Sequence, residues 1–207
     1  MQLHYDARHR LVRIQRRTAQ GEHIEARYHY DALSRRVRKD VTRNGHTETT
    51  RYGWDGDRLV AEETDTRLRT VVYEPGSFVP LLRVELVRGA AAGSDPESSD
   101  EQSDAVDRSN LASLRALLSG TGSPLPAELA SNAEGLQIQF FHTDHLGTPL
   151  RMTDAAGREI WKARNDDWGA VRQEHGETDQ PIRFQGQWED EESGLYYNRF
   201  RHYAASA

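Results

Sequence analysis

The chain has 207 residues, a formal net charge of −6 and 36% hydrophobic residues, and it contains no cysteine. This composition excludes a disulfide framework, a cysteine zinc site and a thiol nucleophile, and no apolar run approaches the ~20 residues that cross a bilayer. Residues 1–17 lack the apolar stretch of a general secretory signal, and scattered aromatics among many charged residues favour a thin, turn-rich β-sheet.

Residues 1–88 are predicted to form a series of β-hairpins. Tyrosine recurs at Tyr5, Tyr30, Tyr52 and Tyr73, each time before a turn-forming group and a stretch in which apolar and charged residues tend to alternate. Aspartate accepts backbone N–H bonds at such turns, and the preceding tyrosine packs over the neighbouring hairpin. The basic excess here is interspersed with acids, so we expect cross-strand charge pairs rather than a nucleic-acid interface.

Residues 89–135 are predicted to form an acidic linker followed by a short amphipathic helix. Residues 94–108 are acidic and serine-rich, which is typical of a disordered segment. Four leucines then fall at helical spacing behind a possible Asn110 cap: Leu111, Leu114, Leu117 and Leu118. Such a stripe is typical of a helix that covers a sheet edge, and docking to a partner is the alternative.

Residues 136–207 are predicted to form a second series of hairpins. The segments IRFQGQW and LYYNRFRHY are expected to pair around Ser193-Gly194, with Gly194 at a positive φ. The acidic run from Glu189 to Glu192 is interpreted as a solvated turn rather than as the paired carboxylates of a glycosidase.

His142-Thr143-Asp144-His145 has the residue types of a metal site. A metal-dependent hydrolase through His142, Asp144 and His145 is therefore one hypothesis, although the segment supplies no further ligand. The alternative is that these side chains satisfy backbone groups at the corner before the Leu146-Gly147-Thr148-Pro149 turn, and we favour it.

The tryptophans suggest a different class of function. If they are exposed on repeated turns, they could bind a carbohydrate or a cell surface. The residues concerned are Trp54, Trp161, Trp168 and Trp188. No Walker loop, dinucleotide-binding glycine pattern or Ser-His-Asp arrangement is recognisable in the sequence.

Several ordered motifs resemble the Rhs, or YD-repeat, family of bacterial polymorphic toxins. Residues 30–36 resemble the Tyr-Asp-x-x-Gly-Arg repeat with Ser34 at the usual glycine, and residues 73–81 resemble the Tyr-x-Pro-Gly-Ser-Phe-x-Pro-Leu phrase. Residues 142–199 resemble the Rhs-associated core. The signature residues are Tyr30, Asp31, Tyr73, Pro75, Gly76, His142, Asp144, His145, Gly147, Trp168, Gly169, Phe184, Gly186, Gly194, Tyr196, Tyr197 and Asn198.

The resemblance implies a mostly β fold in which antiparallel hairpin repeats build part of a spiralling sheet or cocoon around a toxin. It implies a structural role without enzymatic activity, cofactor or metal. The partners would be the remainder of the shell or a toxin chain, together with secretion spike proteins. The protein would reside in the bacterial cytoplasm before secretion, for example by the type VI route, and then outside the cell in a larger assembly.

The sequence departs from the family pattern after His202-Tyr203. The family continues into aspartate-containing motifs at which self-cleavage frees the toxin, whereas this sequence reads Ala-Ala-Ser-Ala. Arg201 matches an arginine of that self-cleavage site, but its aspartate partners are missing. We therefore expect neither self-cleavage nor a C-terminal toxin in this polypeptide.

Overall fold

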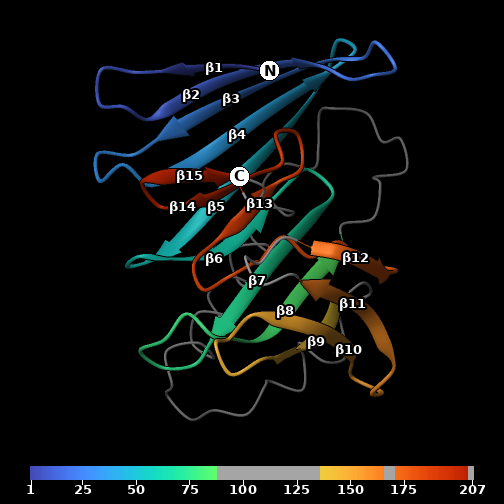
Figure 1. Cartoon of the computed structure of the whole chain (residues 1–207). Coiled ribbons are helices and arrows are strands. Elements are labelled where there is room, and N and C mark those ends of the chain that lie inside the picture. Colours follow the sequence, from blue (N-terminus) through green and yellow to red (C-terminus); the bar gives the residue numbers. More distant parts are fainter. Residues whose placement is uncertain (88–135, 166–170, 205–207) are drawn as a thin grey trace, which may run out of the picture.

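The computed structural model describes residues 1–87, 136–165 and 171–204, and every secondary-structure element in these ranges is a β-strand (Figure 1). Twelve strands form one antiparallel sheet in sequence order, and three more form a small second sheet. The predicted mostly β meander of hairpins is thus confirmed. Within the described ranges, no helix has the length and apolar character needed to cross a membrane. The helix predicted near Leu111–Leu118 lies outside the described residues.

The strands of the large sheet are β1 (Gln2–Tyr5), β2 (Leu11–Arg17), β3 (His23–Tyr30), β4 (Arg36–Arg43), β5 (His46–Asp55), β6 (Arg58–Glu63), β7 (Arg67–Tyr73), β8 (Pro80–Val87), β9 (Leu136–Thr143), β10 (Pro149–Asp154), β11 (Glu159–Asn165) and β12 (Val171–Gly176). The small sheet comprises β13 (Trp188–Asp190), β14 (Leu195–Asn198) and β15 (Arg201–Ala204). Leu86 of β8 lies opposite Leu136 of β9, so one sheet continues across residues 88–135.

The small sheet lies against one face of the large sheet, in front of β4 and β5 in Figure 1. We call this face the inner face and the opposite one the outer face. On β2 to β4 the inner face is apolar, and Leu11, Ile14, Ile24, Ala26, Tyr28 and Val41 form a buried core cluster. A second cluster joins β5 to β7, β9 to β11 and the C-terminal strands, and it includes Trp161, Trp188 and Tyr197. The C-terminal residues thus complete the core of the large sheet.

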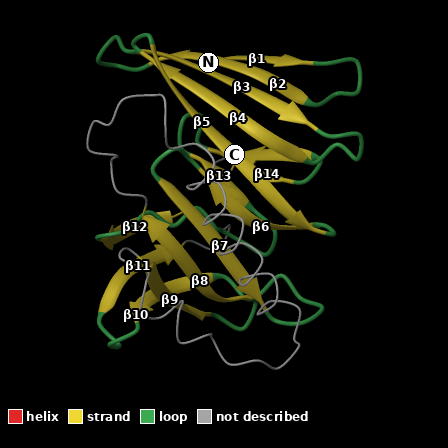
Figure 2. Cartoon of the chain, turned by 180° about the vertical axis from the view of Figure 1, so that it is seen from behind, coloured by secondary structure: helices red, strands yellow, loops and turns green. Residues whose placement is uncertain are grey.

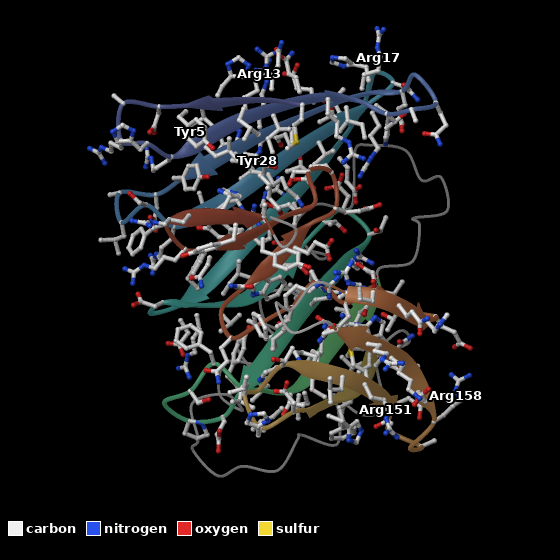
Figure 3. The ribbon with its side chains drawn as sticks, in the orientation of Figure 1. Tyr5, Arg13, Arg17, Tyr28, Arg151 and Arg158 are labelled. Atoms are coloured by element: carbon white, nitrogen blue, oxygen red, sulfur yellow. The ribbon has the colours of Figure 1, made fainter. Side chains whose placement is uncertain are left out.

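The outer face of β2 to β5 is polar. Arg13 donates to Glu25 at 2.6 Å across β2 and β3, and Asp40 accepts from Arg38 and Thr49. Arg13 and Tyr28, both labelled in Figure 3, lie on opposite sides of this part of the sheet. The expected cross-strand charge pairs are therefore present, although pairs this exposed stabilise a fold only weakly.

A five-residue turn recurs between strands and explains the aspartate of the repeat. The carboxylate of its first residue accepts N–H bonds from the third and fifth residues at 2.8–3.0 Å. The four aspartates are Asp6, Asp31, Asp144 and Asp154. The fourth residue of each turn has a positive φ: His9, Ser34, Gly147 and Gly157. Glycine adopts this conformation without the steric cost that a Cβ imposes, which accounts for the family's glycine preference there.

Replacing Ser34 by glycine should stabilise the protein. Ser34 has φ 61°, a left-handed conformation that costs a non-glycine residue about 1–2 kcal/mol, and the greater freedom of glycine in the unfolded chain offsets part of that gain. We expect Ser34→Gly to raise the free energy of unfolding by about 0.5–1 kcal/mol in urea titrations. The control Ala32→Gly adds only backbone freedom in the same turn, so it should lower stability. Equal effects of the two changes would contradict the strain argument.

Candidate functional site at the interface of the two sheets

A buried ionic cluster joins β4 to the turn between β13 and β14. Arg36 Nη1 donates to Asp190 Oδ2 at 2.5 Å, and Lys39 Nζ lies 3.2 Å from Asp190 Oδ1 and 3.1 Å from Glu192 Oε2. Asp190 is 0% exposed and Arg36 is 1% exposed. Buried charges are tolerated when they are paired and hydrogen-bonded, as they are here.

The register of β3 and β4 brings both cations to the inner face. Lys39 lies opposite Tyr28, whose side chain is buried there. The register shifts between His29 and Tyr30, which then lies opposite Arg36. Two residues of unlike parity in β4 can therefore reach the same carboxylate, because a bulge changes the face to which a side chain points.

Tyrosine rings enclose the guanidinium of Arg36. Its central carbon lies 4.1 Å from the ring centroid of Tyr197, 4.7 Å from that of Tyr52 and 5.4 Å from that of Tyr28. The Tyr197 hydroxyl accepts the backbone N–H of Arg36 at 2.8 Å and donates to the Arg199 carbonyl at 2.8 Å. Cation–π contacts of this kind gain strength when water is excluded.

The protonation states of the cluster follow from its composition. Burial alone would raise the pKa of Asp190, but the positive charges of Arg36 and Lys39 outweigh burial and hold this pKa well below its usual range. Burial and the neighbouring charges of Asp190 and Glu192 raise the pKa of Tyr28, whose hydroxyl donates to Glu192 at 2.7 Å. The arrangement therefore fixes charges and holds the two sheets together, and the buried His202 Nε2 lies 3.6 Å from Asp190 Oδ2.

Acidification should destabilise the protein through Asp190. Because its pKa in the folded protein is lower than the 3.8 of an unperturbed aspartate, its stabilising contribution is present above pH 3.8 and is lost as the pH falls toward the folded pKa. Glu62, whose pKa burial raises, acts in the opposite sense. We expect a lower free energy of unfolding at pH 3 than at pH 7, with a smaller difference in Asp190→Asn. Urea titrations at both pH values measure this, and equal stability at both would contradict it.

A second ionic contact holds the segment that precedes β13. Asp179 accepts from Arg69 at 2.5 Å and 2.7 Å, and Arg83 donates to the Asp179 carbonyl and the Thr178 hydroxyl. Burial, followed by the charge of Arg69, lowers the pKa of Arg83 to about 10. The C-terminal segment is thus anchored to β7 and β8 as well as to β4.

A cavity of about 580 Å³ lies beside these two anchors on the inner face. Its lining combines carboxylates such as Glu48, Glu62 and Glu174 with Arg43 and Arg67. Glu174 accepts the indole N–H of Trp161 at 2.6 Å. These groups make the wall of the cavity polar and charged.

The repeat signature residues lie apart from one another and mostly serve the hairpins. Tyr30 donates its hydroxyl to the Leu11 carbonyl at 2.7 Å, and Tyr73 donates to the Leu59 carbonyl at 3.0 Å. Each tyrosine therefore bonds the backbone of a neighbouring hairpin. Asp31 belongs to its turn, and Pro75 and Gly76 lie in an exposed turn with Gly76 at φ 71°.

The His142-Asp144-His145 segment forms a hairpin corner. Asp144 accepts the N–H groups of Leu146 and Thr148, His142 Nε2 lies 3.1 Å from the Thr153 hydroxyl, and His145 is exposed. In the described ranges, no group of three or more His, Cys, Asp and Glu side chains is arranged to hold a metal ion.

Close packing surrounds the glycine that follows this corner. Gly147 has φ 80°, and a Cβ added there would lie 2.7 Å from Val79 Cγ2. The turn also accepts a side chain from the C-terminal segment, because Gln185 donates to the Leu146 carbonyl at 2.5 Å. A side chain at position 147 would disturb both contacts.

The C-terminal signature residues form the predicted hairpin. Trp188 lies opposite Tyr197, and Glu189 lies opposite Tyr196. Gly194 has φ 69°, as expected. Of the other signature residues, Gly186 has φ 74° and packs beside Phe78, Phe184 is half-buried, and Asn198 lies opposite the exposed Arg201. Trp168 and Gly169 lie outside the described residues.

Two interpretations of the sequence are wrong. The run from Glu189 to Glu192 is not a solvated turn as a whole, since Asp190 is 0% and Glu192 is 2% exposed, whereas the Glu191 side chain is 93% exposed. Their partners in β4 lie about 150 residues away, and no local pattern reveals such pairs.

The second error concerns the tryptophans. Trp161 is 2% and Trp188 is 4% exposed, and the half-buried Trp54 donates its indole N–H to the Arg36 carbonyl at 2.8 Å. Trp161 and Trp188 are core residues and Trp54 packs against the core, whereas the carbohydrate-binding alternative requires exposed rings. The fourth, Trp168, lies outside the described residues. The premise of a carbohydrate-binding surface therefore fails for the rings that the structure describes.

Comparisons with known proteins agree with this architecture. A family described as "RHS protein" matches residues 138–175. The "Toxin protein Tse5" of Pseudomonas aeruginosa is 48% identical over 207 residues, and the "Double-stranded DNA deaminase toxin A" of Burkholderia cenocepacia is 31% identical over 212 residues. These alignments cover 100% and 96% of this chain but 14% and 12% of the relatives, so the chain spans only a small part of their length.

The fold also has a counterpart among solved structures. The crystal structure of TcdB2-TccC3 matches 98% of this chain and 8% of its own chain, with a TM-score of 0.59 and 15% sequence identity. At this identity the likeness concerns the fold alone. The family match, the identity to the Pseudomonas aeruginosa toxin along the whole chain and this shared fold lead to one conclusion: the chain belongs to the Rhs family.

Proposed function

We propose that this chain is a structural segment of an Rhs-type β-shell that encloses a toxin. The observation that carries the proposal is the open twelve-stranded sheet, whose end strands β1 and β12 each pair on one side only in the described residues. A sheet with free edges can be extended by strands of the same assembly. The polar cavity and the ionic clusters lie on the inner face, where they would contribute to the wall of an enclosed space.

The proposed partners are the remainder of the shell and the toxin chain that it surrounds, with secretion spike proteins as further contacts. This rests on the small share of the relatives that the chain covers and on their names, which describe toxins. The proposed location is the bacterial cytoplasm before secretion, and then a secreted assembly. The deaminase activity named for one relative is not proposed for this segment, which aligns with 12% of that relative's length.

The free edge of β1 provides the test. In an antiparallel edge strand, successive backbone N–H groups point alternately toward the neighbouring strand and away from it. Of Leu3→Pro and His4→Pro, one therefore removes an N–H that faces solvent and the other removes one that bonds to β2. We expect the isolated chain to self-associate as its concentration rises in sedimentation velocity, and the variant that lacks the outward N–H to associate less while remaining folded.

The second proline variant is the matched control, because it should weaken the pairing of β1 with β2 and lower thermal stability. A chain that sediments as a compact monomer at every concentration, with prolines at both positions without effect, would contradict the proposal. Such a result would mean that the edges are not built to receive further strands.

A further inference from the structure

The outer face of β7, β8 and β9 carries an apolar surface of three cross-strand rows. The rows are Leu68–Leu86–Leu136, Thr70–Val84–Ile138 and Val72–Leu82–Phe140. Directly opposed residues in a sheet point to the same side, so eight apolar side chains and one threonine form a single patch. We call it the outer apolar surface, and its three strands can be located in Figure 2, which views the molecule from behind.

The inner face of the same strands is partly polar. Its rows contain Arg69 with Glu85 and Gln137, and Val71 with Arg83 and Gln139. Farther along the outer face, β4 and β5 present charged and polar residues such as Arg38, Asp40 and Arg51. The residues of the outer apolar surface therefore point away from the core beneath the small sheet and need a cover of their own.

Burial varies within the patch. Leu68 is 8% exposed although it belongs to neither core cluster of the described residues, whereas Phe140 is 39% exposed. Contiguous apolar patches larger than a few hundred Å² are rarely left exposed on soluble proteins, and they usually mark a contact surface.

The connectivity of the chain indicates the occupant. β8 ends at Val87 and β9 begins at Leu136, and both ends flank the row that pairs Leu86 with Leu136. The chain from residue 88 to residue 135 thus leaves and re-enters at the border of the patch. Within that span the sequence places four leucines at helical spacing between Asn110 and Gly120: Leu111, Leu114, Leu117 and Leu118.

We propose that residues 110–119 cover the outer apolar surface with this leucine face. Ten helical residues extend about 15 Å with a diameter of about 10 Å. The patch measures about 10 Å across its three strands and about 14 Å along the strands from the first row to the third. One short helix therefore matches it in size. Residues 110–119 thereby form a helical layer that packs on the outer face of the sheet. This inference is independent of the proposed shell function.

Thiol labelling of the full chain tests the proposal, because the sequence contains no native cysteine. Val84→Cys introduces a thiol at the centre of the patch, and Arg51→Cys introduces one on the polar part of the same outer face. We expect maleimide to label position 84 at least about tenfold more slowly than position 51, because labelling of a covered site requires local opening. Adding Leu114→Asp and Leu117→Asp should raise the rate at position 84 and leave the rate at position 51 unchanged.

The matched control is Ala112→Asp with Ala116→Asp, which adds the same charge to the opposite side of the helical pattern and should keep position 84 protected. Oxidation of Val84→Cys with Leu114→Cys should form a cross-link that Arg51→Cys with Leu114→Cys does not form. Equal labelling at positions 84 and 51, or equal effects of the leucine and alanine variants, would overturn the proposal. Protection that rises with protein concentration would also overturn it and assign the surface to a second copy.

Discussion

Asp190→Asn should cause one of the largest losses of stability available to a single substitution in this chain. In the native protein, Arg36 and Lys39 lie 2.5 Å and 3.2 Å from the Asp190 carboxylate. The amide removes this shared anion and leaves the two cations in a buried or partly buried environment. Removing one partner of a buried pair typically costs about 3–5 kcal/mol, a large share of a total stability of about 5–15 kcal/mol. Equilibrium urea unfolding measures the change.

Glu191→Gln is the matched control, because its side chain is 93% exposed and lies 3.5 Å from Arg43 at the surface. It should change stability by less than about 1 kcal/mol. Should Asp190→Asn fail to fold, Glu192→Gln gives a graded measurement, since it weakens one contact of Lys39 and can still accept from Tyr28. Equal stability of the variants at positions 190 and 191 would show that the cluster does not hold the two sheets together.

Tyr197→Ala should abolish folding or leave a chain that unfolds well below the wild-type temperature. The ring is buried, packs edge-on against Trp54 and lies over the guanidinium of Arg36. Truncating a buried aromatic residue typically costs about 3–5 kcal/mol. The variant also removes the hydroxyl that accepts the Arg36 N–H. Thermal melts followed by circular dichroism measure the loss.

Two further variants separate the contributions of Tyr197. Tyr197→Phe keeps the ring but leaves the buried N–H of Arg36 without its acceptor, so we expect a loss of about 1–3 kcal/mol. Tyr203→Ala truncates a tyrosine of β15 that is 43% exposed, and it should have a much smaller effect. A Tyr197→Ala protein that melts with the wild type would mean that this hairpin does not anchor the fold.

The hairpins could be predicted from the sequence because their signals are local. An aspartate that caps a turn acts on residues two and four positions later, so Asp31 and Asp144 could be interpreted without knowledge of the fold. The same holds for Gly194, whose positive φ follows from the turn that it closes. A hairpin meander is therefore among the folds that short-range patterns describe well.

The interface between the sheets could not be predicted, because its signals are distant in sequence. Arg36 meets Asp190 across 154 positions, and a strand bulge rather than simple alternation turns Arg36 inward. The acidic run looked solvated because adjacent charged residues usually are, and only a partner from β4 changes that expectation. Likewise, Trp161 is buried in the cluster that joins the large sheet to the C-terminal strands, and turn spacing does not reveal that packing.

The separation of 154 positions between Arg36 and Asp190 has a consequence for the order of folding. During synthesis β4 emerges long before the hairpin that neutralises it, so Arg36 of the nascent sheet has no ion-pair partner in Asp190 until residue 190 has left the ribosome. Contacts of such long range slow the final step, because loop closure precedes any energetic gain. The N-terminal hairpins should therefore bind chaperones and be cleaved by proteases most readily in this interval. Refolding should show a slow phase that reports the docking of β13 and β14.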